Sequence, residues 1–334
     1  MDIILNVLNQ TLVFTVPLLA GNRSSHYAII DKNTALGGMF SERSGVVNIA
    51  LEGIMIGGAF VGVYFIYLMQ SANTTMNPQL LLILALIVAG IFGALLSLLH
   101  AFAAINLKAD QTISGTAINM LAPGLGLFLA KLIFNGNSSV PFSNTFRIHE
   151  IPVLSQIPIL GPILFKGAYI TTYLGIVILI LSVIFLNKTK AGLRLRACGE
   201  NPQAADAAGV SVYKYRYMGV LLSGFLGGIG GLIYIIPIST VFNSDVGGYG
   251  FLALAILIFG NWQPYRIATA SLFFGIMKTL AYTYTAIPFL SALGFPSVVY
   301  KLIPYVATLI LLAFTSKNSA APKASGIPYD KSKR

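Results

Sequence analysis

The sequence predicts an all-α fold, a polytopic bundle of transmembrane helices, from two features of its composition. Hydrophobic residues make up 56% of the chain and charged residues only 9%, whereas soluble domains carry about 25% charged residues. The apolar residues also form blocks of about twenty, the length that a helix needs to cross a bilayer core. Blocks such as residues 80–99 are apolar on every side, unlike the alternating strands of a membrane barrel, so we expect helices.

Nine blocks are long enough to be transmembrane spans, and a tenth membrane element is an alternative that the sequence leaves open. In chain order the nine blocks cover residues 3–21, 46–69, 79–105, 111–135, 169–187, 214–240, 246–262, 266–288 and 297–315. Residues 28–40 are only weakly apolar, and a half-span or re-entrant element there would be the tenth. The side of the amino terminus depends on this choice between nine and ten. All these elements belong to one membrane domain over residues 1–315.

Residues 316–334 follow the last span and differ from it in composition. They are mainly Ser, Ala, Lys, Pro and Gly, with too few apolar side chains to form a core. We therefore expect a disordered cytoplasmic tail that is dispensable for insertion and transport.

The basic residues predict which loops share the cytoplasmic side. Lys and Arg gather in residues 188–217 and in the tail, and basic loops favour the cytoplasm. The four predicted spans between these two segments place both on the same side. The same count puts the loop at Lys108 and residues 23–43 inside, and residues 136–168 outside.

Sequence motifs for catalysis, metal binding or nucleotide binding are missing. The chain has no G-x-S-x-G, H-E-x-x-H or G-x-x-x-x-G-K-[ST] pattern, and its single cysteine, Cys198, cannot form a cysteine metal cluster. We expect no catalytic, metal or cofactor-binding residues in this chain, so that a partner or an ion gradient supplies the energy. The net charge is +11, but the basic residues flank apolar blocks, so the charge does not indicate nucleic-acid binding.

Polar residues enter the start of one predicted span in the segment 41–53. Asn48 and Glu52 are four residues apart, which would place them on one helical face. A carboxylate inside a span is costly unless its charge is satisfied. Two interpretations satisfy it equally well: the pair lines a translocation path, or it locks helices together through buried hydrogen bonds.

A second polar stripe follows in the span 111–135. Thr112, Thr116 and Asn119 fall at i, i+4 and i+7, on one face of a helix. The same two interpretations apply. Hydrogen bonding between helices explains the stripe at least as well as a translocation path.

A short helix is predicted in the most basic loop. Asn201 is a favourable N-cap, Pro202 suits the first helical position, and Gly209 can end the helix after an alanine-rich run. A capped helix between two spans has no membrane role of its own, so we expect it to dock a soluble partner. The alternative is a purely structural loop helix.

Two segments carry a resemblance to a known family. Residues 37–55, G-G-M-F-S-E-R-S-G-V-V-N-I-A-L-E-G-I-M, resemble the signature of permease subunits of bacterial nucleoside-type ABC importers, within the group of ribose-type and branched-chain amino-acid permeases. Residues 192–210 are similar to the cytoplasmic coupling segment of that group. G-Y-G-F-L-A-L-A at 248–255, followed by Trp262, also fits the nucleoside branch. The F-S-E-R-S-G-V-V-N form is typical of the shorter of two paired permeases.

The resemblance implies a ribose-type permease fold of about ten helices in the bacterial cell membrane. It implies three kinds of partner: a second related permease, ABC ATPase subunits that bind the ATP, and a lipid-anchored extracellular substrate-binding protein. Within a coupling segment at 188–213, the residues that match the ATPase-coupling motif are Gly199, Glu200, Asn201, Pro202, Ala205 and Gly209. A bulky residue at Ala205 would then block docking.

Other functions remain as alternatives. The same machinery imports simple sugars or branched-chain amino acids in related systems. An ion-coupled secondary transporter would need no docking helix. A membrane-embedded enzyme is disfavoured by the missing catalytic motifs.

Overall fold

A computed structural model describes residues 22–72, 75–150, 152, 166–284, 292–315 and 321–331. Its α-helices are α2 (Asn22–Arg43), α3 (Leu51–Ser71), α4 (Pro78–Ala101), α5 (Gln111–Ile133), α7 (Ile170–Lys188), α8 (Lys190–Glu200), α9 (Pro202–Ala207), α10 (Val212–Ile235), α11 (Tyr249–Phe259), α12 (Pro264–Thr283) and α14 (Ser297–Thr315). A π-helical turn, Phe102–Asn106, continues α4. Two short antiparallel pairs join β1 (Val140–Pro141) to β4 (Val241–Phe242) and β2 (Ile148–Glu150) to β3 (Lys166–Ala168).

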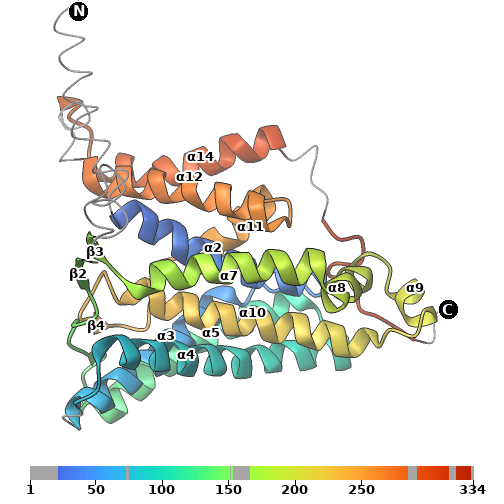
Figure 1. The fold of residues 1–334 in the computed structure, drawn as a ribbon, viewed down its shortest axis with the longest axis horizontal. Helices are drawn as coiled ribbons and strands as arrows, with labels where there is room; N and C mark the ends of the chain where they lie inside the picture. The colour runs from blue at the N-terminus through green and yellow to red at the C-terminus, as the bar shows by residue number, and fades with distance from the viewer. Residues whose placement is uncertain are drawn as a thin grey trace, which may run out of the picture.

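The predicted helical membrane bundle is confirmed. Within the described residues, five helices are long and apolar enough to cross a membrane: α3, α4 with its π-helical extension, α5, α7 and α10. The long helices run side by side in Figure 1, with the short strands at one end and α8 and α9 at the other. The predicted span 3–21 lies outside the described residues.

Helix α2 corrects the prediction of a half-span at residues 28–40. These residues lie within one 22-residue helix, about 33 Å long at 1.5 Å per residue. From Ile30 to Phe40 every side chain is buried, because α2 packs among α7, α10, α11 and α12. A helix surrounded by protein needs no lipid-facing apolar surface, which explains its weak hydropathy. Because Arg23 and Arg43 lie at opposite ends of this helix, they cannot both lie on the cytoplasmic side as predicted.

Two predicted span boundaries are also wrong. The span predicted at 46–69 begins as a helix only at Leu51, after a non-helical stretch. The span predicted at 246–262 is the 11-residue helix α11, which is about 16 Å long and too short to cross a bilayer core. Both departures occur where glycine and polar side chains interrupt an apolar run, and both prove to be parts of the candidate site.

Glycines bring the central helices into close contact. A Cβ at Gly58 on α3 would overlap the backbone of Gly228 on α10, and a Cβ at Gly228 would overlap the carbonyl oxygen of Ala89 on α4. Small residues of this kind let membrane helices pack backbone to backbone. The α3, α4 and α10 helices therefore form a tightly packed unit.

We expect Gly228→Ala to destabilise this unit. The added methyl group has no room beside Ala89, so α10 and α4 must separate, at a cost of about 1–3 kcal/mol for overpacking. Gly124→Ala on α5 is the matched control, because a Cβ there meets no heavy atom within 4 Å. Thermal unfolding of the two purified variants checks the prediction, and equal midpoints would contradict it.

The loops predicted to share one side do lie together. Lys108 Nζ is 3.2 Å from an Asp330 carboxylate oxygen, and an Arg43 Nη1 atom is 3.7 Å from the Glu200 carboxylate. The end of α2, the loop before α5, the α8–α9 segment and the tail therefore meet at one end of the bundle, the α9 end. At the other end, Gln70 of α3 donates to the carbonyl of Ser143, which lies in the segment predicted to be outside.

The described part of the tail differs from the disordered segment that we expected. Residues 321–331 are packed on the α9 end, where the Ala324 amide donates to the Gly199 carbonyl at 2.8 Å. Tyr329 is 5% exposed. The composition correctly indicates that this segment cannot form a core of its own. It instead joins an existing one through a single aromatic anchor, which composition does not reveal.

Candidate functional site

The predicted short helix is confirmed as α9, with the predicted caps. Asn201 Oδ1 accepts a hydrogen bond from the Ala204 amide at 3.0 Å, and Pro202 occupies the first helical position. Gly209 adopts a φ of +78° just after the helix, the left-handed conformation that glycine supplies at helix ends. Local sequence therefore fixes both ends of α9.

The outward face of α9 differs from the one that we expected. Ala205 is buried, in a cluster with Cys198, Val212 and Tyr329. The exposed residues of the helix and its end are Gln203, Ala204, Ala207 and Ala208. The expectation that a bulky residue at Ala205 would meet a partner is therefore wrong, because this side chain faces the protein's own interior.

Helix α8, which is part of the coupling segment, packs against the end of α2. A Cβ at Gly199 would overlap the carbonyl group of Arg43, so only glycine allows this approach. The Glu200 carboxylate pairs with the Arg43 guanidinium at 3.7 Å. The Cys198 side chain is buried beside them, and burial raises the pKa of its thiol to about 11. The end of α8, just before α9, therefore contacts the end of α2 at Arg43.

The segment 41–53, here called the signature segment, also contacts the turn between α11 and α12. The Trp262 indole donates to a Glu42 carboxylate oxygen at 2.6 Å, and Arg43 Nε donates to the Trp262 carbonyl at 3.0 Å. Asn261 and Trp262 both have φ near +50°, which makes this turn tight. Two motifs 220 residues apart thus meet in space. From the sequence alone, Trp262 had no role beyond a motif match.

Asn48 and Glu52 bind different partners. Asn48 Nδ2 donates to Ser223 Oγ on α10 at 2.8 Å, and its Oδ1 accepts from the Ala50 amide. Because α3 begins only at Leu51, the expected shared helical face is wrong for this pair.

Glu52 holds the start of α11. One carboxylate oxygen accepts from the Gly248 amide at 2.9 Å and the other from the Gly250 amide at 2.6 Å. The side chain is buried, and a Cβ at Gly250 would lie 2.5 Å from Glu52 Cα. These are the contacts that the helix-locking interpretation requires.

The second polar stripe divides between two surroundings. Asn119 accepts from the Gly53 amide and donates to the Ile49 carbonyl, both at 2.8 Å, and so joins α5 to the start of α3. Thr112 and Thr116 are exposed, and the Thr116 hydroxyl bonds back to the Thr112 carbonyl of its own helix. Only Asn119 belongs to the signature-segment contacts.

Sequence reasoning missed His100 and Gln111. His100 lies with one ring nitrogen 2.8 Å from the Val47 carbonyl and the other 2.8 Å from Ser114 Oγ, and Gln111 Oε1 accepts from the Val47 amide at 2.7 Å. Both side chains thus bind the backbone of Val47 in the non-helical part of the signature segment. The signal was faint, since each is a single polar residue beside an apolar block.

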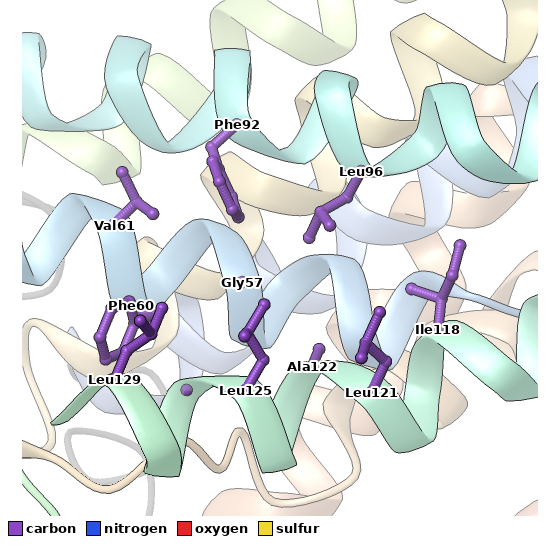
Figure 2. A pocket seen from close by; sticks show the side chains of 11 residues that line it. Gly57, Phe60, Val61, Phe92, Leu96, Ile118, Leu121, Ala122, Leu125 and Leu129 are labelled. Carbon is purple, nitrogen blue, oxygen red and sulfur yellow. The ribbon is translucent and has the colours of Figure 1, made fainter. Parts of the chain in front are cut away.

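An apolar pocket lies between α3, α4 and α5. In Figure 2, Leu121, Leu125 and Leu129 of α5 face Phe92 and Leu96 of α4 across α3. No charged side chain lines it. The lining suits an apolar group and offers no charged side chain to a polar solute. The polar contacts of the α9 end are therefore the stronger candidate for a functional site.

Comparisons with known proteins identify related sequences. The family model described as "Branched-chain amino acid transport system / permease component" matches residues 23–313. The chain is 43% identical to the guanosine ABC transporter permease protein NupQ of Bacillus subtilis over 329 residues, 98% of this chain and 97% of that protein. It is 44% identical to the nucleoside ABC transporter permease protein NupC of Lactococcus lactis, over 90% of this chain and 93% of that protein.

A second Lactococcus lactis protein matches more distantly. The nucleoside ABC transporter permease protein NupB is 23% identical over 87% of this chain and 80% of its own length. No solved structure matches the chain.

Proposed function

The chain belongs to the branched-chain amino acid transport system permease family, and from this premise we propose that it is the membrane-spanning permease subunit of a nucleoside ABC importer. The observation that carries the proposal is identity of 43–44% to two nucleoside-type permeases over nearly the whole chain. The protein is a multi-pass protein of the bacterial plasma membrane, with several helices suited to that position.

The partners are part of the proposal. ABC ATPase subunits bind and hydrolyse the ATP and dock on the exposed face of α9. A second, related permease completes the pathway, and the match of both NupC and NupB to this chain supports such a pairing. A lipid-anchored binding protein delivers the nucleoside from outside.

The contacts at the α9 end explain how docking would move the membrane helices. Gly199 and Glu200 press on Arg43, the last residue of α2. From there the signature segment bonds to α10 through Asn48, to α11 through Glu52 and to α5 through Asn119. A displacement of α9 by the ATPases therefore reaches helices across the bundle through hydrogen bonds and close packing.

Radiolabelled nucleoside uptake in a deletion strain tests the proposed function. The strain complemented with this chain should take up guanosine, with competition from other unlabelled nucleosides and none from glucose or leucine. Loss of uptake on inactivating the ATPase separates an ABC importer from an ion-coupled transporter. Competition by glucose or leucine alone would instead favour import of a sugar or a branched-chain amino acid.

A further inference from the structure

The carboxyl-terminal strap, residues 321–331, joins three elements at the α9 end. The Ala324 amide donates to the Gly199 carbonyl at the end of α8, at 2.8 Å. Arg216 Nη1 on α10 donates to the Ile327 carbonyl at 2.9 Å, and Asp330 pairs with Lys108 at 3.2 Å. Figure 1 shows the strap, in red, at the end of the bundle that carries α8 and α9. The strap therefore crosses the end of the bundle rather than leaving it.

The inner face of the strap supports the coupling helix. Tyr329 is buried in the cluster with Cys198, Ala205 and Val212, and its ring centroid lies 5.5 Å from that of Tyr213. Ala205 and Pro202 are the buried residues of α9. The strap therefore forms part of the surface on which α9 packs.

Arg216 gives the strap a second point of attachment. Its side chain is 1% exposed, and its guanidinium lies against Gly45 of the signature segment, where a Cβ would be 2.8 Å from Nη2. A buried cation is costly unless it is hydrogen-bonded. The Ile327 carbonyl accepts from Nη1 of this guanidinium, while Nε and Nη2 meet no acceptor among the described residues, so the strap offsets part of the cost of burying the charge.

The outer face of the strap continues the outer face of α9. A surface hollow at this place is lined by Asn201, Pro202 and Gln203 at the start of α9 and by Lys323, Ile327 and Pro328 of the strap. Ile327 is 57% exposed, an apolar side chain at the start of the helix. A soluble partner that covers α9 at this end also meets the strap.

We propose that the strap is an integral part of the ATPase-docking face, which seats α9 through Tyr329 and meets the ATPase through Ile327. The inference rests on the proposed function, because the occupant is the ATPase subunit of the importer. It reverses the expectation that the tail is dispensable.

Cys198 allows the seating to be measured without the ATPase. It is the only cysteine in the chain and is fully buried in the cluster that contains Tyr329. Maleimide labelling of the purified permease should be slow in the wild type. Tyr329→Ala and truncation after Ser316 should increase the labelling rate about tenfold or more, because opening of the cluster limits access. Tyr329→Phe should keep the ring and the protection, and Lys331→Ala at an exposed position should behave as the wild type.

Co-expression with the ATPase subunits of the same importer tests the docking. At equal membrane levels, Tyr329→Ala should reduce ATPase recovery and nucleoside uptake about tenfold, the change expected for a modest loss at an interface. Ile327→Asp should lower both while Cys198 stays protected. Full recovery and uptake in Tyr329→Ala and Ile327→Asp would overturn the proposal, as would unchanged Cys198 labelling in the truncated chain. Failure of the wild type to take up nucleosides would count against the proposed function instead.

Discussion

Tryptophan at Ala207 should abolish ATPase recruitment and uptake while leaving the permease folded in the membrane. Ala207 is the last residue of α9 and is exposed, so an indole there disturbs no packing within the chain. It would instead occupy space in the centre of the docking face. Steric exclusion at such a place costs about 2 kcal/mol or more, the size of a hot-spot effect, which is about a thirtyfold loss of affinity.

Ala205→Trp is the matched control on the inward face of the same helix. Ala205 packs on Cys198 and Tyr329, so the indole must displace them at a cost of about 1–3 kcal/mol for overpacking. This variant should lose thermal stability and protect Cys198 less, whereas Ala207→Trp should change neither. Co-purification of the ATPase at matched membrane levels checks the pair. Full ATPase recovery and uptake with Ala207→Trp would leave α9 as a structural loop helix.

The two alanines show what local sequence determines about α9 and what it does not. Its ends follow from Asn201, Pro202 and Gly209, because caps depend on residues within one turn. Its orientation depends on Tyr329, which lies in a segment more than a hundred residues away. A helix of six residues rich in alanine has no hydrophobic stripe to indicate the buried face, so sequence could not choose between Ala205 and Ala207.

Helix α2 shows the same limit for the membrane domain. Hydropathy identifies helices that face lipid, and it found α3, α4, α5, α7 and α10 with small errors at their ends. It underestimates a helix that other helices surround, because Asp31, Lys32 and Asn33 are buried there by protein. The signature segment was recognised as a motif, yet its role as a junction depends on partners such as Trp262, Ser223 and Gly248 that are distant in sequence.

Glu52→Leu should have the second large effect, by releasing the start of α11. The carboxylate is the acceptor for two amides, that of Gly248, which is partly buried, and that of Gly250, which is buried. Leucine leaves both without this acceptor, at about 1–3 kcal/mol for the buried Gly250 amide and less for the partly buried Gly248 amide. The negative charge also lies at the N-terminus of α11, where the helix dipole favours it by about 0.3–1 kcal/mol. A marked loss of thermal stability and of uptake is therefore expected.

Glu52→Gln separates hydrogen bonding from charge at the same site. The glutamine oxygen can accept from one of the two glycine amides, while its NH₂ group, a donor, must face the other. This variant should fall between the wild type and Glu52→Leu in unfolding temperature and in uptake. If Glu52 lined the pathway without holding α11, Leu and Gln would reduce uptake but leave the unfolding temperature unchanged. If Glu52 holds α11 in place, the unfolding temperature and the uptake should both fall in the order wild type, Gln, Leu, because the number of hydrogen bonds to the glycine amides falls in that order.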